Sequence, residues 1–129
     1  MSAITPESLA AGGNEQSHQK AIFCWCALNF KKYPELKFMY HIPNGGFRNQ
    51  REAANLKAAG VRSGVPDIHL PVPRGRYAGL YIELKVGKGK ASDNQEEWIA
   101  FLREHHYKVW VCHGWQSAVQ AIEEYLNVR

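Results

Sequence analysis

Residues 65–72, VPDIHLPV, and residues 80–86, LYIELKV, decide the fold of this chain. Apolar residues alternate along both segments, which is the period-two pattern of half-buried β-strands. Between them, residues 73–77, PRGRY, have the Gly and Arg content of a short exposed turn. The pattern therefore predicts an antiparallel hairpin centred near Gly75.

This hairpin would place Asp67 directly opposite Glu83, because both residues lie eight positions from Gly75. Opposed carboxylates have Cβ atoms roughly 5 Å apart and repel each other unless a positive charge lies between them. We therefore expect a divalent cation between the two acids, with the Lys85 ammonium beside it. The competing interpretation is a solubilising polar face, since a surface Asp and a cross-strand Glu–Lys pair are common on hairpins.

The length of 129 residues predicts a single domain with one core. Hydrophobic residues make up 45% and charged residues 22%, as in ordinary globular proteins, and no apolar run reaches the length of a membrane span. The first residues lack the features of a signal peptide. We expect a flexible N-terminal tail over residues 1–13, a domain over residues 14–129, and a cytoplasmic location.

The three cysteines, Cys24, Cys26 and Cys112, form an odd set without zinc-finger or zinc-ribbon spacing. Reduced core thiols are expected rather than disulfides. On a helix, Cys24 and Cys26 would point about 200° apart and could not ligate one ion. The scattered histidines give no ligand pattern either, and His41 and His69 are expected to be structural.

The net charge of +4 is modest, but most of the basic residues lie in or near connecting segments, where they can meet phosphates. The loop at Pro43-Asn44-Gly45-Gly46 lacks side chains at two positions, which would let a DNA backbone approach closely. A tight turn and ordinary surface charge would explain the same features. The candidate DNA contacts are Asn44, Gly45, Gly46, Arg48, Arg51, Arg62, Lys88 and Lys90.

The remaining segments predict helices around the hairpin. Ser92 and Gln95 have the spacing of a capping box, and Gly60 suits the left-handed position after a helix. The predicted order is a helix over 14–32, a strand over 38–41, a helix over 49–59, the hairpin, a helix after Ser92, a strand over 107–112 and a helix over 115–126. This order indicates a mixed sheet covered by helices, an α/β fold. The first helix is apolar all round, which indicates a buried helix or one covered by a partner subunit.

With these motifs in place, the chain resembles the VRR-NUC nucleases of the PD-(D/E)XK, or restriction-endonuclease-like, superfamily. The resemblance extends from Glu15 to Leu126 and depends on the order of its motifs more than on any single one. A compact chain without attached domains looks like the standalone, often phage-borne members. The motifs are Glu15 with Gln19, His41-Ile42-Pro43-Asn44-Gly45-Gly46, Gly64-Val65-Pro66-Asp67, Glu83-Leu84-Lys85, Ser92 with Gln95, and the strand from Val109 to Cys112.

The resemblance implies a restriction-endonuclease-like fold, with a mixed central β-sheet flanked by α-helices, and a metal-dependent nuclease activity. It implies that Asp67 and Glu83 bind Mg²⁺ or Mn²⁺, that Lys85 positions the attacking water, and that Glu15 is a further acidic ligand. Gln95 matches a supporting catalytic position, although its capping-box role with Ser92 would explain it equally well. Independently, the peptide carbonyl of Leu84 lies between the two side chains and offers a neutral oxygen to the cation.

The implied function is a DNA endonuclease that leaves 5′-phosphate and 3′-hydroxyl ends. Standalone members of the family resemble junction-resolving enzymes, so the expected substrate is branched DNA, such as four-way (Holliday) junctions or flaps met in DNA repair. The expected form is a homodimer, without an organic cofactor and without a membrane partner. Two alternatives stay open at this point: a catalytically silent DNA-binding module of the same fold, and an RNA-processing nuclease.

Overall fold

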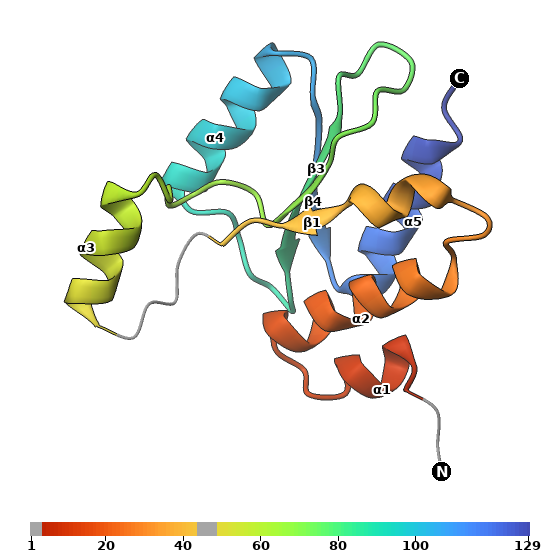
Figure 1. Cartoon of the computed structure of the whole chain (residues 1–129), viewed down its shortest axis with the longest axis horizontal. Helices are drawn as coiled ribbons and strands as arrows, with labels where there is room; N and C mark the ends of the chain where they lie inside the picture. The colour runs from red at the N-terminus through yellow and green to blue at the C-terminus, as the bar shows by residue number, and fades with distance from the viewer. Residues whose placement is uncertain (1–3, 44–48) are drawn as a thin grey trace.

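A four-stranded mixed sheet lies between helices in the structure, a computed structural model that describes residues 4–43 and 49–129 (Figure 1). The strand order is β1-β2-β3-β4; β2 is antiparallel to both β1 and β3, and β3 is parallel to β4. The strands are β1 (Tyr40–His41), β2 (Ile68–Leu70), β3 (Leu80–Lys85) and β4 (Lys108–His113). The helices are α1 (Pro6–Ala10), α2 (Glu15–Leu28), the 3-10 helix η1 (Pro34–Phe38), α3 (Gln50–Ala58), α4 (Asp93–Glu104) and α5 (Trp115–Leu126).

The predicted hairpin and its register are confirmed. β2 and β3 pair so that His69 lies opposite Tyr81, and the same register places Asp67 opposite Glu83. Gly75 lies in the turn with a positive φ of 55°, which glycine adopts without steric cost. The alternation of apolar residues therefore identified both the strands and their alignment.

The two faces of β3 carry different chemistry, because successive side chains of a strand point to opposite sides. One face packs on α2 and α5 and forms the main core, with buried Leu80, Ile82 and Leu84 at its centre. Each fully buried aliphatic side chain of this kind contributes about 1.5–3 kcal/mol to folding. The other face carries Tyr81, Glu83 and Lys85 and lies toward α4, on the opposite side of the sheet from α5 (Figure 1).

Helix ends confirm two of the predicted caps. At the start of α4 the backbone N–H of Gln95 donates to Ser92 Oγ at 3.2 Å, and Ser92 N–H donates to Gln95 Oε1 at 2.8 Å. After α3, Gly60 has φ 108° and donates to the carbonyl of Lys57 at 3.1 Å. The next residue, Val61, donates back into the helix, which completes a Schellman motif.

Besides β2, which covers only three residues of the segment 65–72, two elements are shorter than predicted. α2 ends at Leu28 rather than near residue 32, because the side chain of Asn29 donates to the carbonyl of Trp25 at 2.8 Å and caps the helix. The strand predicted over 38–41 is confined to β1, since Pro34 starts a 3-10 turn that continues to Phe38. Both changes come from local caps and turns that compete with longer regular elements.

The N-terminal segment contains a helix where the sequence analysis expected a flexible tail over residues 1–13. Thr5 caps α1 through a hydrogen bond from the Ser8 N–H at 3.0 Å, and Pro6 occupies the first helical position. Leu9 and Ala10 are half-buried against the main core, so α1 packs on the domain. No helix among the described residues has the length and apolar character needed to cross a membrane.

Candidate metal centre

Asp67 is held from both sides at the start of β2. Its side-chain Oδ2 accepts the backbone N–H of Leu84 at 2.8 Å, so the carboxylate replaces the strand carbonyl that β3 would otherwise meet there. Its main-chain carbonyl accepts from Ile42 N–H at 2.7 Å and contacts His41 Nδ1 at 2.9 Å. The Asp67 side chain is therefore fixed between β1 and β3 and lies beside Glu83.

Glu83 is almost fully buried, with 1% of its surface exposed. Burial raises the pKa of its carboxyl group to about 8, and the negative charge of the neighbouring Asp67 acts in the same direction. The Lys85 ammonium, 3.4 Å from Glu83 Oε2, opposes this shift and is outweighed. Glu83 Oε1 is buried and has no hydrogen-bond partner among the described residues.

These observations fit a divalent cation. Two carboxyl groups that face each other share a proton when no cation separates them, and a buried unpartnered oxygen is costly unless an ion binds it. The N–H and C=O groups of a strand residue point to the same side. Because the Leu84 N–H meets Asp67, we expect the Leu84 carbonyl to face the same edge, and its role as a neutral ligand stays a prediction. Hard oxygen atoms of this kind suit Mg²⁺ or Mn²⁺.

The protein ligand set at this point is small. The described residues contain no group of three or more His, Cys, Asp or Glu side chains placed to hold a metal. Mg²⁺ commonly binds through one or two carboxylates and retains several waters. Asp67 and Glu83 therefore suffice for a site that leaves coordination positions open to water and substrate.

Gln95 connects the acids to α4. Its Oε1 accepts from Lys85 Nζ at 3.0 Å and from the backbone N–H of Ser92 at 2.8 Å, while its Nε2 donates to Glu83 Oε2 at 3.1 Å. One side chain thus completes the capping box and orients both charged residues of β3. The capping-box explanation of Gln95 is confirmed, and its supporting catalytic role stays a prediction.

Glu15 is the one predicted acidic ligand that the structure does not group with the others. It is the first residue of α2, its side chain is exposed, and it belongs to no three-residue cluster among the described residues. An acid in this position also interacts favourably with the helix dipole. Its role as a ligand stays a prediction.

The predicted DNA contacts lie on exposed segments. Arg51 is exposed on α3, Arg62 is exposed just after it, and Lys88 and Lys90 are exposed in the loop between β3 and α4. Arg62 points back to the carbonyl of Lys57 at 3.5 Å. Four further candidates, Asn44, Gly45, Gly46 and Arg48, lie outside the described residues.

Two histidines near the acids have structural partners. His41 contacts the Asp67 carbonyl. The motif His41-Ile42-Pro43 does not by itself predict this contact. His69 stacks on Tyr81 with ring centroids 4.2 Å apart and planes at 8°, and its Nδ1 lies 2.6 Å from the Tyr40 hydroxyl. Burial lowers the pKa of His69, which favours the neutral ring.

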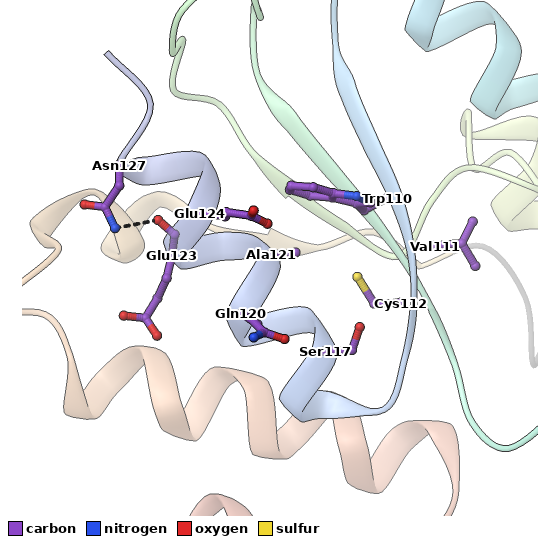
Figure 2. Close-up of a pocket in the computed structure, with 9 residues that line it drawn as sticks. All are labelled: Trp110, Val111, Cys112, Ser117, Gln120, Ala121, Glu123, Glu124 and Asn127. Carbon is purple, nitrogen blue, oxygen red and sulfur yellow. Dashed lines mark hydrogen bonds between the residues drawn. The ribbon is translucent and has the colours of Figure 1, made fainter.

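A cavity of about 630 Å³ lies on the other side of the sheet, between β4 and α5 (Figure 2). Its lining includes Trp110, Cys112, Ser117, Gln120 and Glu124. Burial raises the pKa of the Cys112 thiol to about 11, so this cysteine is a protonated core residue at neutral pH. The cavity is thus separate from the acidic pair, which faces α4.

Comparisons with known proteins agree with the fold. The family model described as the VRR-NUC domain matches residues 13–116. A solved structure described as a VRR_NUC domain protein is 30% identical to this chain, with a TM-score of 0.73, and the match covers 88% of each chain. No curated protein matches the sequence.

Proposed function

The chain belongs to the VRR-NUC domain family and has its nuclease-type fold, and we propose that it is a divalent-metal-dependent endonuclease that hydrolyses phosphodiester bonds in DNA. One observation carries the proposal: Asp67 and Glu83 are opposed at the sheet, and a buried oxygen of Glu83 has no partner among the described residues. Such a pair is unfavourable in an apolar interior and favourable around a hard cation.

The residues of the centre have separate roles in the proposed reaction. Asp67, Glu83 and the Leu84 carbonyl hold the cation, and Gln95 keeps the Glu83 carboxylate oriented. When bound, a divalent cation supplies Lewis-acid stabilisation of the developing phosphate charge and a more acidic water. Lys85 has three N–H donors, of which one meets Gln95 Oε1 at 3.0 Å, and its ammonium forms an ion pair with Glu83 Oε2 at 3.4 Å.

With these two partners among the described residues, Lys85 keeps a donor for a water or for the scissile phosphate. A positively charged donor held in this way aligns the nucleophile and stabilises charge that develops in the transition state. A separate strong general base is not required. Water attacks phosphorus in line with the 3′ oxygen and loses a proton to solvent, the P–O3′ bond breaks, and the 3′ oxygen leaves and takes up a proton, which gives 5′-phosphate and 3′-hydroxyl ends.

We further propose that the substrate is branched DNA, such as a four-way junction or a flap, and that a homodimer presents two centres to it. The exposed basic side chains of Arg51, Arg62, Lys88 and Lys90 support contact with phosphates, as does the net charge of +4. In this scheme the catalytic domain extends over residues 14–129, and Glu15 contributes from the start of α2.

The test compares cleavage of end-labelled duplex, flap, four-way junction and RNA, with Mg²⁺, Mn²⁺ or EDTA. We expect cleavage of branched DNA with either metal, none in EDTA, and none by Asp67→Ala, which should still bind DNA. A silent DNA-binding module would bind equally with and without metal and cut nothing. If RNA is cleaved in preference to DNA, the substrate is RNA and the proposal of a DNA endonuclease is wrong.

A further inference from the structure

The first turn of α4 makes a second connection to the metal centre, next to that of Gln95. Asn94 Nδ2 donates to the carbonyl of Ser63 at 3.0 Å and to Ser63 Oγ at 2.8 Å. Ser63 lies 31 positions earlier in the chain, in the segment that leads from α3 to Asp67. The contact therefore links the segment that leads to Asp67 to α4, the helix whose Gln95 already orients Glu83.

Gly64 shows how closely this segment lies against α4. It is buried, it has φ +89°, and an added Cβ would lie 2.7 Å from Asn94 Nδ2 and 3.0 Å from Trp98 Cδ1. Any other residue would be strained in this conformation and would collide with both side chains. Gly64 thus allows the backbone to lie close against the Asn94 side chain, and this close packing restricts the position of the segment.

The path from this contact to the acid is short and stiff. Ser63 and Asp67 are four residues apart, and between them Pro66 is fully buried with its φ fixed by the ring. Upstream, α3 has no fully buried side chain, and the chain after it is held to the helix through Val61 and Arg62, before Ser63 is reached. Asp67 is also held by β1 and β3, so a displacement at Ser63 would strain the Leu84–Asp67 hydrogen bond and shift the carboxylate within these contacts.

From this arrangement we propose that Asn94 is a positioning residue of the metal centre. It touches neither the cation nor the substrate; it holds the segment from Ser63 to Asp67 so that the Asp67 carboxylate stays opposite Glu83. Two consecutive amides of α4 then set the two halves of the centre, Asn94 for Asp67 and Gln95 for Glu83. This inference rests on the proposed function, since it assumes that the acids bind a divalent cation.

The experiment measures Mn²⁺ affinity by electron paramagnetic resonance of the free ion, for the full chain and three variants. Asn94→Ala removes both hydrogen bonds, and Asn94→Leu keeps a side chain of similar size without a donor. Gln116→Ala is the matched control, because Gln116 is an exposed amide at the equivalent position in the first turn of α5. We expect weaker binding for both Asn94 variants, by up to about tenfold, which is the lower end for groups bonded directly to a metal ligand, and less than twofold for the control.

A second readout needs no metal. The Leu84 N–H donates to Asp67 Oδ2, so its hydrogen-exchange rate reports whether the carboxylate is in place. Asn94→Ala should accelerate exchange of this amide in the metal-free protein, whereas Gln116→Ala should not. Ser63→Ala removes one of the two acceptors and should give a smaller change, and it covers the case in which the Asn94 variants do not fold.

The outcomes separate the two proposals. If the unaltered protein binds no Mn²⁺ at its acids, the proposed function fails. If it binds Mn²⁺ and both Asn94 variants bind within twofold of it with unchanged Leu84 exchange, the function stands and the positioning role is wrong. Wild-type affinity in Asn94→Leu alone would also contradict the hydrogen-bond basis of the proposal.

Discussion

The raised pKa of Glu83 predicts an unusual pH dependence for the metal-free protein. The folded carboxyl group has a pKa of about 8, against an ordinary value of 4.5. Between these values the folded protein keeps a proton that the unfolded chain has lost. Folding stability must therefore fall as the pH rises through this window and level off above about pH 8.

The size of the effect follows from one proton. Each pH unit inside the window lowers the free energy of unfolding by on the order of 1 kcal/mol, which gives about 3 kcal/mol between about pH 5 and pH 8. Glu83→Gln carries a neutral side chain of the same shape, so its free energy of unfolding should not show this decrease between about pH 5 and pH 8. Near pH 8 the variant should be at least as stable as the unaltered protein.

Urea unfolding at a series of pH values, in EDTA, measures the free energy of unfolding of the two proteins. The difference between them removes the contribution of other titrating groups, because these groups are the same in both proteins. Adding Mg²⁺ should stabilise the unaltered protein more as the pH rises, because the cation replaces the shared proton, and should leave Glu83→Gln unchanged. Parallel pH profiles for the two proteins in EDTA would refute the reasoning.

Three further predictions concern single side chains. Lys85→Ala should lower the cleavage rate at least about 100-fold while Mn²⁺ binding persists, as measured by single-turnover kinetics and titration; cleavage at the unaltered rate would rule out water positioning. Gln95→Ala should cost about 1 kcal/mol in urea unfolding through the lost cap and also weaken Mn²⁺ binding several-fold; an effect on stability alone would reduce Gln95 to a capping residue. Tyr125→Phe removes the hydrogen bond from a buried hydroxyl to the Val72 carbonyl, 2.5 Å long, and should cost about 1 kcal/mol without altering Mn²⁺ affinity; a change in affinity would show that the two faces of the sheet are coupled.

The parts of the fold that could be predicted are those encoded locally. Apolar alternation specifies strand faces, and a turn at Gly75 then sets the register that opposes Asp67 and Glu83. The capping box of Ser92 and Gln95 likewise acts over three residues. Such signals do not depend on the remainder of the chain.

The missed features depend on tertiary contacts or on weak local signals. His41 meets the Asp67 carbonyl and Asn94 meets Ser63 across 26 and 31 positions, and no spacing rule connects such residues. Helix α1 is a different case, since Thr5 and the following proline form an N-terminal signal. That signal alone does not predict a helix, because a helix this short is stable only when it packs on another element, here α2.

The central claim is that Asp67 and Glu83 together bind a hard divalent cation. Anomalous diffraction from crystals soaked in Mn²⁺ tests it directly. The account predicts a single strong peak within bonding distance, about 2.2 Å, of an oxygen from each carboxylate. A structure with both side chains ordered, manganese in the solution and no peak between them would contradict it.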